Sequence, residues 1–293
     1  MTVTHNSERE LGQLLESVSR HLAGAHLVVA DSGSSDGSLA LAASWAGRVT
    51  TLPQRENVGF GRAANAGVAA VEEPVTVVLN PDVELLDGSL DELAREAVRG
   101  DRPERILAPV VLLPDGSRQD SAQLEPGAPA LALSALVPAV ALPAPLRRAV
   151  DPWRSERPRR VGWAVGCCLA ARTETLSRLG PFDEGIFLYG EDLELGLRAS
   201  DEGVETWFWP AARVLHHRAH STARAFGGEP FELLARQRRA VVTRRRGPGR
   251  ARLDDALQLA TFADRVALKR LLRRPAERER RQLAALRRAR RGA

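Results

Sequence analysis

The stretch LYGEDLELGLRAS, residues 188–200, places three carboxylates, Glu191, Asp192 and Glu194, directly after Gly190. A carboxylate within hydrogen-bond reach of a hydroxyl group can act as a general base, which typically speeds a reaction by about 10²–10⁴-fold. Acidic residues also stabilise the first turn of any helix, because they face the positive end of the helix dipole. The pattern alone therefore fits both a catalytic pair and an ordinary helix start.

Two further carboxylates follow apolar runs that are typical of buried strands. Asp31 ends LVVAD and precedes a Gly- and Ser-rich loop, which suits phosphate, while the carboxylate suits a ribose or a base. Asp82 follows Pro81, which stops a strand ladder. A helix-capping role explains either aspartate as well. His216 follows another strand pattern and could complete a divalent-cation site near these loops, although histidine pairs are more often structural.

The elements that must position these residues alternate along the first part of the chain. Apolar runs at 27–31, 48–52 and 74–80 predict strands, and helical patterns separate them. This alternation implies an α/β fold with a parallel sheet, in which ligands bind at the carboxyl ends of the strands. Farther on, we predict a strand pair at 105–117, a Pro-rich, weakly structured connector at 120–160, a strand entering a helix at 161–180, a strand at 204–210, and basic helices from 232 that break near 247–249 and at 275.

Charge is distributed unevenly along the 293 residues. Residues 236–293 hold 20 Arg and Lys against 5 Asp and Glu, a net charge of +15, so the remaining 22 basic and 32 acidic residues give −10. Adjacent Cys167 and Cys168 cannot easily pair, which favours a reducing, cytoplasmic setting. The N-terminus shows no basic region followed by an apolar run, and prolines interrupt the apolar segment that starts at Pro129, so we predict neither a signal peptide nor a spanning helix.

Five motifs in order resemble the family 2 glycosyltransferases, in particular a rhamnosyltransferase-like branch that acts on cell-envelope glycolipids. The resemblance covers roughly residues 4–224. Two departures are a short first strand in MTVTHNS, where the family usually has an apolar strand before a TYN-like motif, and a loop that is less rich in glycine after His216. The motifs are DSGSSDGS, NVGFGRAANAG, LNPDVEL, GPFDEGIFLYGEDLELGLR and VLHHRAHST.

This resemblance implies a GT-A fold, which is a Rossmann-like sheet that binds a nucleotide diphosphate sugar and Mg²⁺ or Mn²⁺. By position, Asp192 matches the catalytic base, and Glu191 is expected to bind or support the acceptor. Asp82 and His216 match the metal ligands. Glu194 is expected to be an ordinary helix residue, and Arg198 to form a structural ion pair. The implied nucleotide-sugar-binding residues are Thr4, Asn6, Asp31, Ser32, Asn57, Gly59, Asn65, Gly67, Asn80 and Asp82, with Asn80 standing where the family's first metal-motif carboxylate usually is.

The implied activity is inverting, metal-dependent transfer of a sugar, with L-rhamnose from dTDP-L-rhamnose as the best match and a polyprenyl-diphosphate-linked or other envelope glycan as acceptor. A galactofuranosyl- or other hexosyltransferase that uses a UDP-sugar is the alternative within the class. A catalytically inactive protein that binds nucleotides or nucleic acid is the alternative outside it. The basic segment lacks the interleaved aromatic residues of a base-stacking surface, so we expect no nucleic-acid partner.

The sequence divides into an expected glycosyltransferase domain at 1–225 and a basic helical extension at 226–293. Arginines gain on the order of 1 kcal/mol each near anionic headgroups, and a lipid-linked acceptor lies at a bilayer. We therefore expect a cytoplasmic protein that is peripherally associated with the inner face of the cell membrane through this extension. A solvated or homo-oligomer-forming helical extension is the other interpretation.

Overall fold

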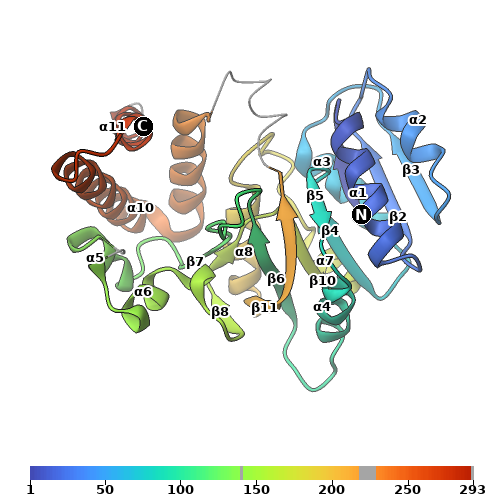
Figure 1. Cartoon of the computed structure of the whole chain (residues 1–293), viewed down its shortest axis with the longest axis horizontal. Coiled ribbons are helices and arrows are strands. Elements are labelled where there is room, and N and C mark those ends of the chain that lie inside the picture. Colours follow the sequence, from blue (N-terminus) through green and yellow to red (C-terminus); the bar gives the residue numbers. More distant parts are fainter. Residues whose placement is uncertain (139–140, 218–228, 292–293) are drawn as a thin grey trace.

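The computed structural model describes residues 1–138, 141–217 and 229–291. A twisted mixed sheet runs through its centre, with helices packed on both faces (Figure 1). The strands between β3 and β4 pair in parallel, as the sequence predicts, and β10 then enters antiparallel to β4 and β6. In spatial order the strands are β3 (Val49–Pro53), β2 (Leu27–Asp31), β1 (Thr2–Thr4), β4 (Val75–Leu79), β10 (Cys168–Arg172), β6 (Arg105–Leu112), β11 (Glu205–His216) and β5 (Val83–Leu85), and β8 (Arg159–Val161) pairs with β11.

Strand β2 shows why helices cover both faces of the sheet. Leu27 and Val29 belong to one buried cluster, and Val28 and Ala30 belong to the other. Because successive side chains of a strand point to opposite faces, an uninterrupted apolar run needs cover on both sides. The first cluster contains residues of α1 (Glu8–His21), α2 (Ser38–Ala43) and α4 (Ser89–Ala97), and the second contains residues of α3 (Phe60–Ala69), α7 (Thr173–Leu179) and α8 (Glu191–Asp201).

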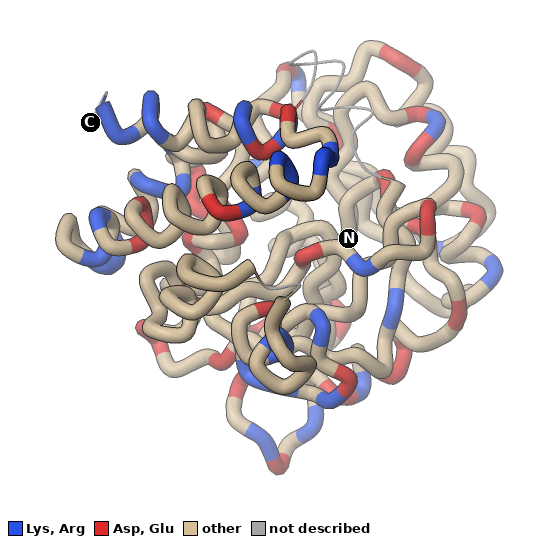
Figure 2. Tube along the Cα trace, turned by 60° about the vertical axis from the view of Figure 1, so that its left-hand side comes forward, with Lys and Arg blue, Asp and Glu red and all other residues tan. Residues whose placement is uncertain are grey.

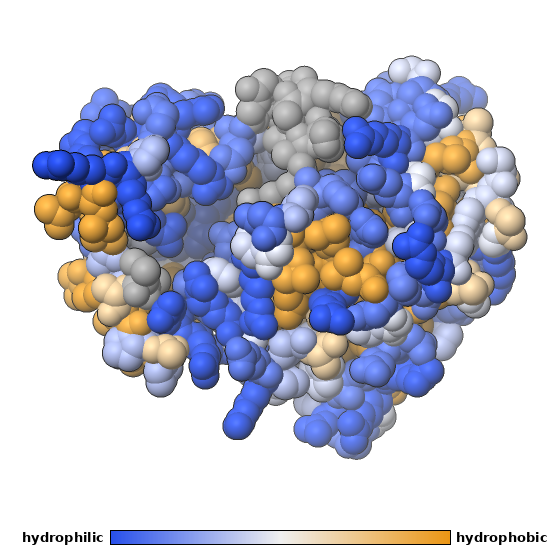
Figure 3. Space-filling view, in the orientation of Figure 1, coloured by the Kyte–Doolittle hydropathy of each residue, from blue (hydrophilic) through white to orange (hydrophobic). Residues whose placement is uncertain are grey.

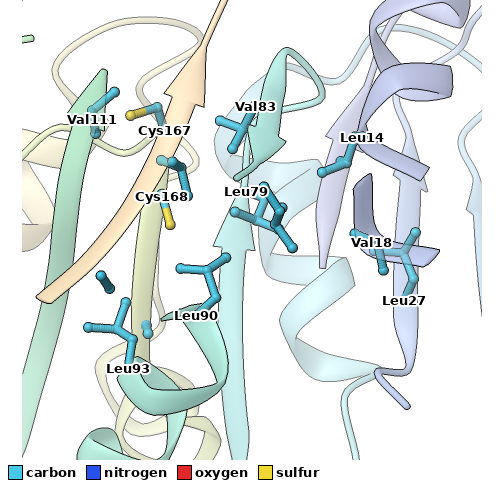
Figure 4. Packing of buried hydrophobic residues seen from close by; sticks show 14 of the residues in the cluster. Leu14, Val18, Leu27, Leu79, Val83, Leu90, Leu93, Val111, Cys167 and Cys168 are labelled. Atoms are coloured by element: carbon cyan, nitrogen blue, oxygen red, sulfur yellow. The ribbon is translucent and has the colours of Figure 1, made fainter. Parts of the chain in front are cut away.

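The core under α1 and α4 contains both cysteines. Figure 4 shows Leu14 beside Val18 and Leu79, and Leu90 and Leu93 below Cys168. Burying a leucine side chain contributes about 1.5–3 kcal/mol, and Leu14 is fully buried. Both thiols are free and buried, and burial raises the pKa of Cys168. Cys168 therefore fills the core as an uncharged thiol.

The prediction of a weakly structured connector at 120–160 was wrong. This segment forms β7 (Ala122–Gln123), α5 (Ala130–Leu136), α6 (Ala144–Val150), a 3₁₀ turn (Pro152–Arg154) and the start of β8, and β7 pairs with β9 (Trp163–Ala164). Pro129 and Pro143 stand immediately before the two helices, at their N-cap positions. Proline is well tolerated there, because the missing N–H would have no partner within the helix.

The C-terminal part consists of α10 (Phe231–Leu271) and α11 (Glu277–Arg291). Helix α10 breaks at Gly247, which has φ 82° and ψ 164°, next to Pro248, so the predicted break is confirmed. The two helices pack on each other, and α10 also contacts α5 and α8. The division at residues 225 and 226 lies outside the described residues and stays a prediction. No helix in the described part of the chain is long and apolar enough to cross a membrane.

Candidate active site

A buried carboxylate and a buried hydroxyl meet at the carboxyl ends of β1 and β2. Thr4 pairs in register with Asp31, and neither residue is more than 2% exposed. Asp31 Oδ2 accepts a hydrogen bond from the N–H of Ser34 at 3.0 Å. Within the described residues, Asp31 Oδ1 and Thr4 Oγ1 have no partner. Since buried polar atoms nearly always find one, these two oxygens mark an edge at which a polar ligand would complete the pairing.

The loop after Asp31 is held against two neighbouring segments. Asn6 Oδ1 accepts a hydrogen bond from the N–H of Ser35 at 2.8 Å. Ser32 Oγ donates to Asn57 Oδ1 at 3.1 Å and accepts from the N–H of Val58 at 3.0 Å. A Cβ on Gly33, which has φ +68°, would lie 2.5 Å from a backbone carbon of residue 56. The structure therefore brings Thr4, Asn6, Asp31, Ser32 and Asn57 together around one loop.

The remaining residues of the second motif have packing contacts. A Cβ on Gly59, which has φ +83°, would lie 2.8 Å from the ring of Phe187. Asn65 donates to the carbonyl oxygen of Phe182 at 2.8 Å and accepts from its N–H at 2.9 Å. A Cβ on Gly67 would clash with Met1 at 2.1 Å. Asn65 and Gly67 thus hold α3 to the sheet and to the loop before α8, and their place in a donor pocket stays a prediction.

The two predicted metal ligands meet where β5 pairs with β11. His216 lies opposite Val83 in the register, and its Nε2 is 3.2 Å from Asp82 Oδ1. Gln119 Oε1 lies 2.8 Å from His216 Nδ1. An amide oxygen only accepts hydrogen bonds, so Nδ1 carries a proton. The Nε2 atom is then a second donor to Asp82 when the ring is charged, or a lone pair aimed at the same point when it is neutral.

The charge on Asp82 is stabilised in this setting. Burial raises the pKa of Asp82, but the hydrogen bond and the charge of His216 outweigh that effect and hold the pKa below its ordinary value. A carboxylate and an imidazole nitrogen are ligands that Mn²⁺ accepts. Within the described residues, no group of three or more His, Cys, Asp or Glu side chains is placed to hold a metal ion. Asp82 and His216 thus offer two ligands of kinds that a divalent cation accepts, and their role as metal ligands stays a prediction.

The opening carboxylates of α8 are half-buried and close to each other. Helix α8 begins after Gly190, which has φ 91°. Asp192 Oδ2 accepts from the N–H of Gly166 at 3.2 Å, and its Oδ1 accepts from the N–H of Leu193 at 2.7 Å. Burial raises the pKa of Asp192. Burial and the charge of Asp192 together raise the pKa of Glu191 to about 8, and Glu191 Oε2 has no partner among the described residues.

Two adjacent residues connect these carboxylates to the turn that contains Asp82. The N–H of Gly166 binds Asp192, and the carbonyl oxygen of Cys167 accepts the N–H of Asn80 at 3.0 Å. Asn80 in turn begins the turn that contains Asp82, since its carbonyl oxygen accepts the N–H of Val83 at 3.2 Å. The segment between β9 and β10 therefore holds the start of α8 beside the turn between β4 and β5.

Glu194 is a buried carboxylate that pairs with two arginines, so the expectation of an ordinary helix residue was wrong. It is fully buried and forms ion pairs with Arg198 at 2.9 Å and with Arg245 of α10. Arg198 also donates to the carbonyl oxygen of Pro181 at 3.1 Å, so its predicted structural pairing is confirmed. Val241 and Val242 of α10 pack in the same buried cluster as residues of α8. The basic segment is thus partly built into the body that holds Asp192.

Three residues that support the site were missed from the sequence. Gln119 orients His216, Gly166 orients Asp192, and Arg238 of α10 lies close enough to Asp192 for its charge to counter the effect of burial on that pKa. None of them belongs to a motif, and each is at least 26 positions from the residue it affects. Residues 218–222 of the last motif lie outside the described residues.

Comparisons with known proteins show the family to which the chain is similar. The model of Glycosyl transferase family 2 matches residues 1–103. Over 212 residues the chain is 36% identical to the N-acetylglucosaminyl-diphospho-decaprenol L-rhamnosyltransferase of Mycobacterium tuberculosis, covering 68% of each protein. It is 37% identical to the rhamnosyltransferase WbbL of Escherichia coli K12 over 71 residues, which are 24% of this chain and 26% of that one.

Solved structures share the fold at lower identity. A crystal structure of GalNAc-T7 with UDP, GalNAc and Mn²⁺ superposes with a TM-score of 0.59 at 19% identity, over 82% of this chain and 46% of that one. Residues 1–349 of S. aureus TarS in complex with UDP-GlcNAc superpose with a TM-score of 0.54 at 13% identity, over 97% of this chain and 78% of that one. The predicted GT-A fold is confirmed, and the chain belongs to the family 2 glycosyltransferases.

Proposed function

We propose that this glycosyltransferase moves L-rhamnose from dTDP-L-rhamnose, with inversion, onto a sugar carried by a polyprenyl diphosphate. The names of the relatives from M. tuberculosis and E. coli support the sugar, and the first also supports the lipid-linked acceptor. The observation that carries the site assignment is the connection through Gly166 and Cys167, which holds the carboxylates of α8 beside the turn of Asp82.

In this proposal Asp192 is the general base. Its two oxygens are fixed by the N–H groups of Gly166 and Leu193, and each keeps a lone pair for the hydroxyl group of the acceptor. The hydroxyl proton passes to Asp192 as its oxygen bonds to the anomeric carbon and the bond to the nucleoside diphosphate breaks. A base with a raised pKa transfers protons efficiently near neutral pH. One displacement of this kind inverts the anomeric centre.

Glu191 has a complementary role. With a pKa of about 8 it carries a proton at pH 7, and its Oε2 has no partner among the described residues. A protonated carboxyl group donates a hydrogen bond, so Glu191 would bind an acceptor oxygen and would not compete with Asp192 for the proton. A carboxyl group that its surroundings keep protonated can donate a hydrogen bond at a pH where an ordinary carboxylate only accepts.

Asp82 and His216 would hold Mg²⁺ or Mn²⁺, which would neutralise the negative charge that develops on the leaving diphosphate. Asp31, Thr4 and the loop at 32–35 would bind the nucleoside with the buried oxygens that have no partner among the described residues. By accepting the Nδ1 proton of His216, Gln119 would leave Nε2 available to the cation. The presence of Mn²⁺ in the GalNAc-T7 structure supports a metal in this fold.

The test follows release of nucleoside diphosphate from dTDP-L-rhamnose and from UDP-sugars, with Mn²⁺ and then with EDTA. We expect turnover of dTDP-L-rhamnose that needs the metal, and a loss of about 10²–10⁴-fold in Asp192→Asn. Asp201→Asn is the matched control, because Asp201 lies at the other end of α8 and pairs with Arg246 on the surface.

Each contrary result has a definite meaning. Unchanged turnover in Asp192→Asn would remove the base assignment. Preference for a UDP-sugar would replace rhamnose by galactofuranose or another hexose. Binding of dTDP without turnover of any donor, in the presence of acceptor, would leave the catalytically inactive alternative.

A further inference from the structure

Most arginines in the first half of α10 bind carboxylates of the same chain. Their partners lie in α8, in the segment before α5, in the loop before α8 and in the second half of α10. Figure 2 shows acidic residues close to basic residues in the C-terminal part of the chain. The positive charge of this part is therefore largely neutralised inside the molecule. The pairs are Arg238 with Asp254, Arg239 with Asp255, Arg244 with Asp183, Arg245 with Glu194, and Arg246 with Glu125 and Asp201.

The turn between α10 and α11 differs from this part because its leucines and arginines are exposed. Leu271 is 80% exposed and Leu272 is 52% exposed. The flanking Arg270, Arg273 and Arg274 are exposed and form no ion pair with any other residue that the structure describes. We call residues 270–274 the RLLRR turn. It places two adjacent apolar side chains among three positive charges that form no ion pair within the described part of the chain.

The RLLRR turn is an ordered feature of the chain. The N–H of Leu272 binds the carbonyl oxygen of Leu268 at 2.9 Å, and the N–H of Arg274 binds that of Lys269 at 2.7 Å. Arg273 has φ 54°, a conformation that costs a residue with a side chain about 1–2 kcal/mol. Lys269 pairs with Glu279 of α11 at 2.7 Å. The leucines are thus presented outward by a hydrogen-bonded turn.

A third exposed leucine lies on a helix that packs against α10. Helix α5 contacts α10, and its last residue, Leu136, is 78% exposed. Figures 1 and 3 show α5 and the end of α10 at the same end of the molecule, where apolar surface borders strongly hydrophilic surface. Exposed apolar groups in a basic setting are typical of surfaces that enter the interface of a bilayer.

We propose that the RLLRR turn docks on an anionic lipid bilayer, with Leu271 and Leu272 entering the acyl boundary and the three arginines binding lipid phosphates. We choose a bilayer over a protein because the arginines complement anionic headgroups and the two leucines suit an apolar layer. The choice also rests on the proposed function, whose acceptor is lipid-linked. Nucleic acid fits less well, because within the turn no aromatic side chain offers a stacking surface. This proposal assigns membrane contact to five residues and not to the whole basic segment.

The experiment measures sedimentation of the full chain with vesicles of phosphatidylglycerol and phosphatidylcholine, and with vesicles of phosphatidylcholine alone. We expect binding only to the anionic vesicles at low salt. Leu271→Ser with Leu272→Ser should weaken it at least about tenfold, since each leucine loses its burial. Arg270→Ala with Arg273→Ala and Arg274→Ala should weaken it on the order of 100-fold.

Two control variants match these changes on a distant part of the surface, near α4. Val98→Ser alters an exposed apolar residue, and Arg95→Ala with Arg99→Ala and Arg102→Ala removes the same charge. Thermal unfolding would confirm that each variant folds. Equal vesicle binding by the turn variants and the wild type would overturn the proposal. Absence of vesicle binding by the wild type, with a concentration-dependent dimer lost in the leucine variant, would overturn it in favour of a second copy of the chain.

Failure of the proposed function would look different. Turnover with a short-chain, water-soluble acceptor should be the same in the wild type and the turn variants, while turnover with a long-chain acceptor in vesicles should fall only in the turn variants. Vesicle binding that depends on the turn, without rhamnosyl transfer to either acceptor, would sustain the docking surface and remove the proposed function.

Discussion

Glu194 offers the sharpest test of the inference that α10 is part of the same folded unit as α8, the helix that contains Asp192. The substitution Glu194→Gln keeps the size of the side chain but removes the charge that pairs with Arg198 and Arg245. Removing one partner of a buried ion pair typically costs about 3–5 kcal/mol, because the other charge stays buried. The side chains of Arg198 and Arg245 are 12% and 28% exposed, and Arg198 keeps its bond to Pro181, so both can be partly rehydrated. We therefore expect the lower end, about 3 kcal/mol.

Thermal unfolding measures this loss directly. For a chain of this size, about 3 kcal/mol corresponds to a fall in Tm of about 6–10 °C. Glu232→Gln is the control, because Glu232 pairs with Arg236 and Arg288 on the surface, where ion pairs contribute little. Equal Tm values for Glu194→Gln and the wild type, or equal losses in Glu194→Gln and Glu232→Gln, would refute the reasoning.

Three further predictions concern the site. The pKa of Glu191 is about 8 in the folded state and ordinary in the unfolded state, so the folded state binds the proton more tightly, and the stability of the wild type should fall as pH rises from about 4.5 through 8. In urea unfolding, the stability of Glu191→Gln should fall less over the same pH range. An identical pH dependence of the two proteins would contradict this prediction. Gln119→Leu should raise the Mn²⁺ concentration for half-maximal activity about 10–100-fold with little change at saturating metal, and an unchanged metal requirement would show that Gln119 does not orient His216. Gly33→Ala should destabilise the protein and weaken dTDP binding measured by calorimetry, because the added Cβ would lie 2.5 Å from a backbone atom. Gly116→Ala is the control, since Gly116 has φ +77° but lies in open space, and it should show only the conformational cost of about 1–2 kcal/mol. Similar effects of both changes would argue against a tight loop at Gly33.

The parallel part of the sheet could be predicted because its signals are local. The apolar run 27–31 needs cover on both faces wherever it lies in the fold, and that requirement alone implies a strand between layers of helices. The connector at 120–160 was mistaken because proline was taken as a helix breaker. Pro129 and Pro143 directly precede helices, and the packing of α5 against α10 and α6 exists only in the folded chain.

The carboxylates at Asp31, Asp82 and Asp192 were visible in the sequence, since their chemistry and their place after strands or before a helix are local properties. Their relation to each other was not, because the link from Asp192 to Asn80 runs through Gly166 and Cys167, which are joined to both only in the folded chain. The pKa shifts of Asp82, Glu191 and Asp192 likewise depend on burial, which only the folded chain decides.

The sequence by itself indicated the strands and helices of the parallel part of the sheet, the family and the candidate site residues, because these depend on neighbours along the chain. The tertiary structure decided which charges are available. It buried Glu194 between Arg198 and Arg245, neutralised most arginines in the first half of α10, and left the RLLRR turn exposed. A count of basic residues cannot separate these cases, because the free energy of a charge depends on what surrounds it and not on its position in the chain.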